Sequence, residues 1–180
     1  MFNFEITPDF IIGQILSAIA TIITFLMFQM NSKKLILIMQ TVGIVFLCAS
    51  YFFLDATTGL MLNAVAITRN AFYYFQTTGT KANKITSYIF AGIMAGIGFF
   101  SWEAWYSLLL IIALAVHTVY LSKGNAQLLR KSILFTSTLA TVYNAFVLSI
   151  GGFIFETFSI IASIVGIIRY NRAQKKKINK

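Results

Sequence analysis

The sequence has little charge, one cysteine and one proline. Asp, Glu, Lys and Arg together make up 11% of its 180 residues, and its mean hydropathy is +0.81. A soluble domain of this size needs far more polar residues to cover its surface. Because Cys48 is the only cysteine, an internal disulfide and a cysteine-based metal site are excluded. The composition therefore indicates an integral membrane protein.

Sequence motifs for catalysis are missing as well. The sequence contains no paired-carboxylate site, no His/Cys/Glu ligand cluster, no nucleophile elbow and no phosphate-binding loop. We therefore predict a protein that is not an enzyme and that needs no cofactor or metal. The net charge of +9 does not indicate nucleic acid, because the basic residues form short clusters between apolar runs. No nucleic-acid partner is expected.

What the sequence does contain is a series of long apolar stretches. Stretches of about 17–23 residues match single helices across a hydrocarbon core of roughly 30 Å. Seven are predicted, at 9–30, 33–54, 57–77, 85–101, 104–121, 128–149 and 152–170. Since every loop is short, residues 1–180 are predicted to form a single integral membrane domain of the all-α class. A basic cytoplasmic tail, 171–180, follows the last helix.

The charged residues predict how this domain is oriented. Every Lys and Arg except Arg69 falls on one side of the seven-helix threading. The positive-inside rule then places the N-terminus outside and the C-terminus in the cytoplasm. No Lys or Arg precedes the first stretch, so we expect it to be a retained span rather than a signal peptide. The acidic residues expected on the outer side are Glu5, Asp9, Asp55 and Glu103.

The first three and the last three stretches share their loop pattern and their charge pattern. A shift of 93 residues aligns Leu16 with Leu109, Phe53 with Phe146, and Gly59 with Gly152. Both triplets start outside and end inside, which requires one helix between them. We therefore predict two parallel three-helix bundles, 9–77 and 104–170, joined by a linker helix at 85–101 (a 3+1+3 arrangement). Parallel repeats of this kind occur in transporters, where the substrate-binding site lies between the two halves.

Polar residues inside the stretches recur at helical spacing. They form one face in each of four stretches: Gln14, Ser17, Thr21 and Thr24; Asn63 and Asn70; Ser137, Thr141 and Asn144; Glu156, Ser159 and Ser163. Lipid-facing surfaces avoid such residues, so these faces are expected to point into the bundle. Two interpretations stay open. The faces line a passage or binding site, or they hydrogen-bond the helices to one another.

The ionisable residues far from the loops include Arg69, Glu156 and His117. Such a side chain is unfavourable at membrane depth, so it indicates either function or a buried bond. Arg69 is interpreted as a substrate or gating residue, or as a side chain that extends to the cytoplasmic headgroups. Glu156, which the shift of 93 pairs with Asn63, is interpreted as a site residue, and no direct ion pair with Arg69 is expected. His117 is interpreted as a packing residue or as a proton-coupling group.

Two further patterns concern the helix surfaces. Aromatic residues near the ends of the stretches, among them Tyr51, Tyr73 and Trp105, are predicted to form interfacial belts. Gly92 and Gly96 are four residues apart and are predicted to allow close helix packing. A homo-oligomer stays open as an interpretation.

Two segments carry a family resemblance, LNAVAITRNAFYYF and VYNAFVLSIGGFIFETFSIIASIVGIIRYNR. The order YN, GG, a Glu within the helix, and IIRY before a basic end resembles the YgjV family of bacterial inner-membrane proteins. The resemblance covers nearly the whole chain and implies a multi-pass protein of the bacterial cytoplasmic (inner) membrane.

The 3+1+3 arrangement is similar to the SWEET sugar transporters and the PnuC vitamin transporters. In SWEETs, asparagines on the third and seventh helices line the substrate site. The similarity implies this role for Asn63 or Asn70 on the third stretch, and for Glu156 or Ser163 on the seventh.

The sequence as a whole predicts a small-molecule transporter or facilitator with a central polar site between two three-helix bundles. The solute contacts are predicted to be Asn63, Asn70, Asn144, Glu156, Arg69 and Ser159. The alternative is a non-transporting membrane scaffold or accessory subunit that binds a partner protein. The expected partners are the lipid bilayer and a small-molecule solute of unknown identity.

Overall fold

The computed structural model describes residues 7–27, 33–75, 81–122 and 126–178, and this part of the chain contains seven α-helices and no β-strand. The helices are α1 (Pro8–Met27), α2 (Lys33–Phe53), α3 (Thr57–Phe75), α4 (Lys81–Phe100), α5 (Ser107–Leu121), α6 (Ala126–Phe146) and α7 (Ile150–Ile178). Each overlaps one predicted stretch, which confirms the all-α prediction. The largest difference is at α7, which continues to Ile178, so most of the segment predicted as a tail is helical.

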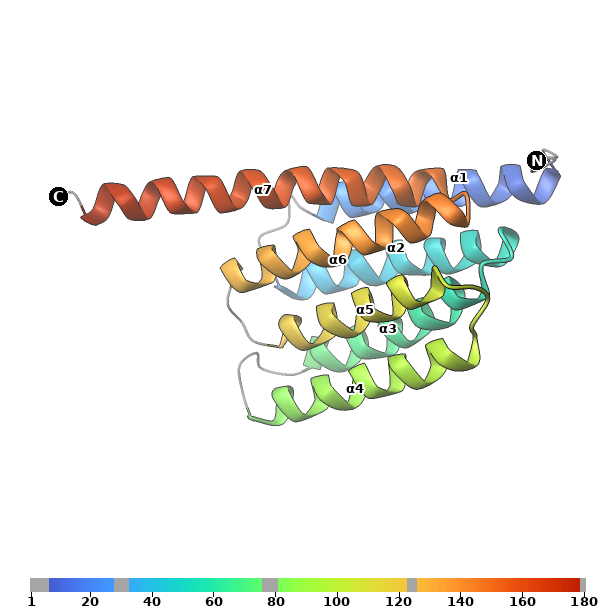
Figure 1. The fold of residues 1–180 in the computed structure, drawn as a ribbon, viewed down its shortest axis with the longest axis horizontal. Helices are drawn as coiled ribbons and strands as arrows, with labels where there is room; N and C mark the ends of the chain where they lie inside the picture. The colour runs from blue at the N-terminus through green and yellow to red at the C-terminus, as the bar shows by residue number, and fades with distance from the viewer. Residues whose placement is uncertain (1–6, 28–32, 76–80, 123–125, 179–180) are drawn as a thin grey trace.

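Successive helices run antiparallel and pack side by side (Figure 1). The helices α1, α2 and α3 form one layer, and α7, α6 and α5 lie over them as a second layer. At one edge of the two layers α4 packs against α3 and α5, and at the other edge α7 packs against α1. Since the number of helices is odd, α1 begins and α7 ends at opposite ends of the bundle (Figure 1).

The α2–α3 turn and the α6–α7 turn have the same geometry. Each contains one residue in the left-handed region, Asp55 (φ 53°) in the first and Leu148 (φ 55°) in the second. Three backbone hydrogen bonds of the first turn also recur in the second turn, 93 residues further on. In the α2–α3 turn they run from Leu54 N–H to the Ser50 carbonyl, from Ala56 to Tyr51, and from Leu60 to Ala56. In the α6–α7 turn they run from Val147 N–H to the Tyr143 carbonyl, from Ser149 to Asn144, and from Phe153 to Ser149. The two turns therefore share the register of the sequence shift.

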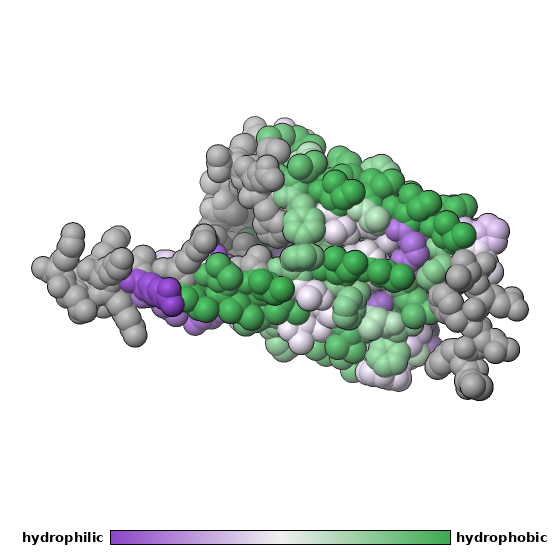
Figure 2. All heavy atoms as spheres, turned by 90° about the horizontal axis from the view of Figure 1, so that it is seen from above, coloured by the Kyte–Doolittle hydropathy of each residue, from purple (hydrophilic) through white to green (hydrophobic). Residues whose placement is uncertain are grey.

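The described surface is apolar, whereas much of the interior is polar. Large apolar side chains are exposed on α1 and α7, such as Ile22 (60%) and Ile161 (52%), and Figure 2 shows the apolar band on this face. Ser17, Thr58 and Ser107 are fully buried. A soluble protein shows the opposite distribution, because water favours polar groups at the surface. The distribution is the one expected for a bundle surrounded by lipid.

Within the described residues, two helices are long and apolar enough to cross a membrane, judged by length and hydropathy alone. They are Pro8–Leu26 of α1 and Ile150–Arg172 of α7. Shorter apolar helical segments lie in α2, α4 and α5, at Ile38–Phe53, Lys84–Phe100 and Ser107–Leu121. Neither α3 nor α6 is among them, and both carry buried polar residues of the predicted site. Seven membrane crossings therefore stay a prediction.

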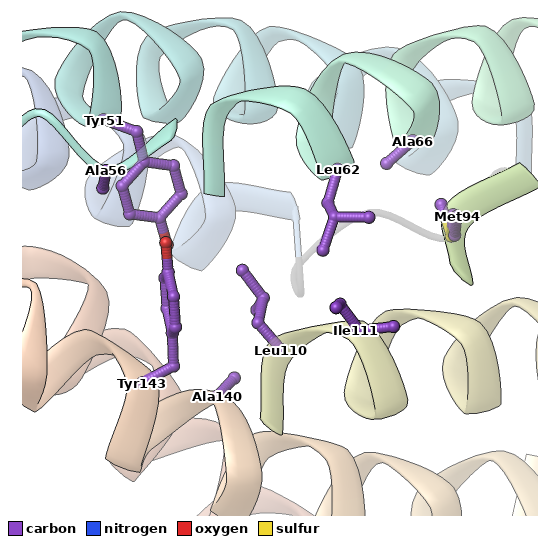
Figure 3. Packing of buried hydrophobic residues seen from close by; sticks show 9 residues of the cluster. All are labelled: Tyr51, Ala56, Leu62, Ala66, Met94, Leu110, Ile111, Ala140 and Tyr143. Atoms are coloured by element: carbon purple, nitrogen blue, oxygen red, sulfur yellow. The ribbon is translucent and has the colours of Figure 1, made fainter. Parts of the chain in front are cut away.

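An apolar cluster lies between the two layers (Figure 3). Leu62 of α3 packs with Leu110 and Ile111 of α5 in this cluster. Beside them, the rings of Tyr51 and Tyr143 point toward one another from α2 and α6, with centroids 6.1 Å apart in an edge-to-face arrangement.

The burial of two tyrosines corrects the prediction of interfacial belts. Tyr51 is 2% exposed and Tyr73 is 4% exposed, so neither faces lipid. Their side chains turn inward because each lies on the face of its helix that packs against the rest of the bundle. Trp105 is 59% exposed, as an interfacial residue should be.

Glycines mark one close helix contact and one open helix face. A Cβ built on Gly151 of α7 would lie 2.6 Å from the backbone carbon of Ser17 in α1, so these two helices approach closely there. Among the described residues, nothing lies within 4 Å of a Cβ built on Gly92 or Gly96 of α4. The prediction that Gly92 and Gly96 allow close packing is therefore wrong for the described part of the chain.

Candidate functional site

The polar faces predicted from the sequence are largely buried. The residues under 10% exposed on these faces are Ser17 and Thr21 in α1, Asn63 and Asn70 in α3, Ser137 and Asn144 in α6, and Ser159 and Ser163 in α7. Gln14, Thr24, Thr141 and Glu156 are half-buried. The prediction that these faces point into the bundle is confirmed.

A chain of hydrogen bonds links the two layers near the C-terminal ends of α2 and α6. The hydroxyl of Tyr51 donates to Oδ1 of Asn144 at 2.8 Å, and the N–H of Gly59 donates to the hydroxyl of Tyr143 at 2.8 Å. Nδ2 of Asn63 donates to the carbonyl of Gly59 at 2.8 Å. We call Tyr51, Gly59, Asn63, Tyr143 and Asn144 the tyrosine seam. It brings two predicted site residues, Asn63 and Asn144, into one cluster.

The tyrosine seam depends on two glycines that leave room for its polar atoms. A Cβ on Gly59 would lie 2.8 Å from the Tyr143 hydroxyl, and a Cβ on Gly152 would lie 2.6 Å from Oδ1 of Asn144. Both distances are shorter than real Cβ contacts, so any side chain at either position would displace a seam residue. These are the two glycines that the shift of 93 residues aligns.

The α6–α7 side of the bundle carries polar groups that have fewer hydrogen-bond partners than those of the tyrosine seam. The carboxyl of Glu156 lies within hydrogen-bonding reach of Ser137 and close enough to Tyr51 for an electrostatic interaction. Among the described residues, the buried hydroxyls of Ser149 and Ser159 have no hydrogen-bond partner. A buried hydroxyl without a partner is uncommon, and it can accept a bond from a ligand or a water molecule.

The start of α3 is held by a loop residue. The N–H of Thr58 donates to a carboxylate oxygen of Glu103 at 3.1 Å, and the Thr58 hydroxyl lies 2.9 Å from that of Ser107. A carboxylate is favourable at a helix N-terminus because it accepts from N–H groups that lack a partner within the helix. Glu103 therefore has a structural role between the α4–α5 loop and α3.

Arg69 lies in a second cluster, between α3 and α5. Its guanidinium is 1% exposed and donates from Nη1 to the Thr118 hydroxyl at 2.8 Å. Its Nε and Nη2 donate to Oδ1 of Asn70 at 3.2 and 3.0 Å. We call Arg69, Asn70 and Thr118 the Arg69 cluster. None of these bonds involves Glu156, in agreement with the expectation of no direct ion pair, and burial of Arg69 shows that it does not extend to headgroups.

Two hollows open on the sides of the bundle rather than at its centre. The larger, about 460 Å³, lies between α3 and α4 and is lined by residues that include Met61, Thr68 and Ile97. The smaller, about 300 Å³, lies between α2 and α3 and is lined in part by Asn70. Of the predicted site residues, Asn70 lines one of these two hollows. The side chains of the tyrosine seam are at most 6% exposed, so the seam is packed shut between the layers.

Sequence reasoning missed three residues that organise these clusters. Tyr51 and Tyr143 carry the bonds of the seam, and Thr118 binds Arg69. A signal for Tyr51 was present, since the shift of 93 residues aligns it with Asn144. A search for identical residues does not detect this pair, because tyrosine and asparagine differ. For Thr118 the sequence holds no signal that separates it from the other threonines of the apolar stretches.

The family model Imp-YgjV, described as a bacterial inner membrane protein, matches residues 11–174, and the chain belongs to this family. The predicted family and the inner-membrane location are thereby confirmed. No curated protein and no solved structure matches the chain. The similarity to SWEET and PnuC transporters stays a prediction.

Proposed function

We propose that this member of the Imp-YgjV family carries a small polar solute across the bacterial inner membrane, through a site between the α1–α3 layer and the α5–α7 layer. The observation that carries the proposal is the placement of polar groups. They gather between the two layers, and two of the buried hydroxyls, those of Ser149 and Ser159, have no partner among the described residues. Helix packing alone gives no reason to bury hydroxyls that bond nothing.

The proposal includes the 3+1+3 repeat, with seven crossings, an outside N-terminus and a cytoplasmic C-terminus. Two observations support the repeat. The α2–α3 and α6–α7 turns share their hydrogen bonds at a spacing of 93 residues. The Tyr51–Asn144 bond joins two residues that are themselves 93 apart. Equivalent residues of two halves contact one another where they lie close to the axis that relates the halves, so α2 and α6 would flank that axis.

In this proposal the solute contacts come from three helices. Asn63 of α3, Asn144 of α6, and Glu156 and Ser159 of α7 supply acceptors and donors. The seam is closed, so a solute enters only when the layers separate. The Tyr51–Asn144 bond crosses between the layers and would break in that motion. Arg69 and Asn70 form a separate part of the path, nearer the end of α3.

A non-transporting scaffold is the second candidate function, and no catalytic role is proposed in either case. The observation that favours a scaffold is the open face of α4. Gly92 and Gly96 are exposed there, and nothing in the described chain packs within 4 Å of them. In this alternative a second protein covers α4, and the polar seam only holds the helices together.

Access of water to the seam distinguishes the two functions. Cys48 is the only cysteine, so a Cys48→Ser background carries single cysteines at chosen positions. We expect a small membrane-impermeant methanethiosulfonate to label Asn63→Cys and Ser159→Cys. The matched control is Ala66→Cys, since Ala66 is buried on α3 in the apolar cluster.

Labelling at positions 63 and 159 with no labelling at position 66 supports a solute path. If none of the three cysteines is labelled, the seam is helix packing and the scaffold function is favoured. If all three react at one rate, the reagent reports general opening of the bundle, and the transport proposal fails.

A further inference from the structure

Arg69 carries a buried positive charge that no described carboxylate neutralises. Its guanidinium has five N–H groups. Three of them donate, to the Thr118 hydroxyl and to Oδ1 of Asn70, and both acceptors are neutral. Tyr73 and His117 are the ionisable side chains close enough to interact with Arg69, and neither is an anion at neutral pH. The charge therefore lacks a counter-ion within this part of the chain.

Asn70 adds further donors at the same place. Its Oδ1 accepts both bonds from Arg69, while its Nδ2 is buried and has no partner in the described structure. Among the described residues, two N–H groups of Arg69 and two of Asn70 are thus left without an acceptor. Buried N–H groups nearly always find an acceptor, because leaving them unpaired is unfavourable. The Arg69 cluster has an excess of donors and a deficit of negative charge.

A groove gives access to this cluster from the side of the bundle. It lies between α2 and α3, has a volume of about 300 Å³, and is lined by apolar residues such as Ile38, Val42 and Phe75. Asn70 lines the same groove and contacts Arg69. A group in the groove therefore lies next to Asn70, whose side chain contacts the guanidinium.

We infer that Arg69 and Asn70 form a binding site for an oxyanion group, either a carboxylate or a phosphate. Such a group supplies both missing features, since it carries negative charge and several acceptor oxygens. The planar guanidinium binds two oxygens of one oxyanion at once, and the amide binds a third lone pair. The oxyanion belongs either to a free solute or to a lipid headgroup that reaches in through the groove.

The test uses the full chain purified in a neutral detergent, with the melting temperature as the readout. A ligand that binds the folded state alone raises the melting temperature by mass action. Inorganic phosphate is the soluble probe, measured against sodium chloride at matched ionic strength. Micelles with added phosphatidylglycerol are the lipid probe. At about 100 times the Kd, a rise of roughly 8 °C is expected.

Two variants make the test specific. Arg69→Gln removes the charge and should abolish the rise with either probe. Asn70→Asp places a carboxylate beside Arg69, so it should raise the melting temperature without added anion and remove the response to the probes. The matched control is Arg130→Gln, which removes a positive charge from α6, outside the Arg69 cluster, and should keep the full response.

Each result decides the inference. A rise with phosphate that Arg69→Gln abolishes assigns a soluble oxyanion, and a rise with phosphatidylglycerol alone assigns a lipid headgroup. No rise with either probe overturns the inference, as does an equal rise in Arg69→Gln. An Asn70→Asp protein that melts below the parent also contradicts it. Binding is measured without transport, so the inference and the transport proposal can fail separately.

Discussion

The tyrosine seam and the Arg69 cluster are both buried, polar and built on α3, yet they differ in how well their polar groups are paired. In the seam, the bonds to Asn144, to Tyr143 and to the Gly59 carbonyl all fall at 2.8 Å. In the Arg69 cluster, one acceptor atom of Asn70 serves two guanidinium nitrogens, and the amide nitrogen bonds nothing.

This difference separates polar residues that bond one another in the closed bundle from polar residues that lack a partner there. Removing a hydrogen-bonded pair between helices should destabilise the closed bundle. A cluster with spare donors gains stability only when something binds. The following substitutions test that distinction, from the largest expected effect to the smallest.

Gly152→Val should have the largest effect, because it forces the seam apart. The new Cβ would lie 2.6 Å from Oδ1 of Asn144 and 2.8 Å from the Ser149 hydroxyl. We expect a loss of about 3 kcal/mol in the free energy of unfolding in mixed micelles. Gly92→Val is the control, since nothing lies within 4 Å of its Cβ, and it should change stability by less than about 1 kcal/mol. Equal effects at the two positions would mean that the seam is not tightly packed.

Tyr51→Phe should lower the free energy of unfolding by about 2 kcal/mol, because it leaves Oδ1 of Asn144 buried without this donor. In a chain of this size that change corresponds to a fall of roughly 6 °C in melting temperature. Tyr88→Phe, at a tyrosine that is 63% exposed on α4, is the control and should leave the melting temperature unchanged. A neutral Tyr51→Phe would show that the cross-layer bond does not stabilise the closed bundle.

Thr118→Val should lower the free energy of unfolding by about 1.5 kcal/mol, since the charged guanidinium of Arg69 loses one acceptor at Nη1. Thr138→Val, where the hydroxyl is exposed and bonds its own helix, serves as the control. Thermal denaturation of both variants measures the difference. A loss as large as that of Tyr51→Phe would place the Arg69 cluster among the helix-holding contacts and remove its contrast with the seam.

Ser159→Ala should have the smallest effect on stability, within about 0.5 kcal/mol of the parent, because its buried hydroxyl has no partner to lose. Ser50→Ala is the matched control, since the Ser50 hydroxyl donates to the Gly13 carbonyl at 2.8 Å and its loss should cost about 1 kcal/mol. Chemical denaturation in micelles compares the two. A large destabilisation by Ser159→Ala would mean that this hydroxyl is part of the packing after all.

The sequence was sufficient for the helices and for the faces that they bury. Hydropathy placed each helix, and the spacing of Asn63 and Asn70 or of Ser137 and Asn144 indicated an inward face before any contact was known. Such predictions succeed because periodicity within one helix fixes which residues share a side. The continuation of α7 was missed because a run of charges was interpreted as a tail, although Ala, Gln and Lys are good helix formers.

The pairing between helices could not be predicted in the same way. Tyr51 lies near the end of α2, where a tyrosine is typical of a membrane interface, and only the facing α6 makes it a buried donor. The bond between Arg69 and Thr118 joins residues 49 positions apart. The threonine that contacts the guanidinium is decided by how α5 packs against α3. That packing could not be predicted from the spacing of residues within either helix.

The contact between α1 and α7 has a consequence for biosynthesis. The Thr21 hydroxyl bonds the Gly151 carbonyl, a residue that the ribosome adds 130 positions later. At roughly 5–20 residues per second, α1 is without α7 for about 10 s. During that delay Ser17 and Thr21 can donate to the carbonyls of Gln14 and Ser17 within their own helix. The polar groups on this face of α1 can thus be satisfied in lipid until α7 is made.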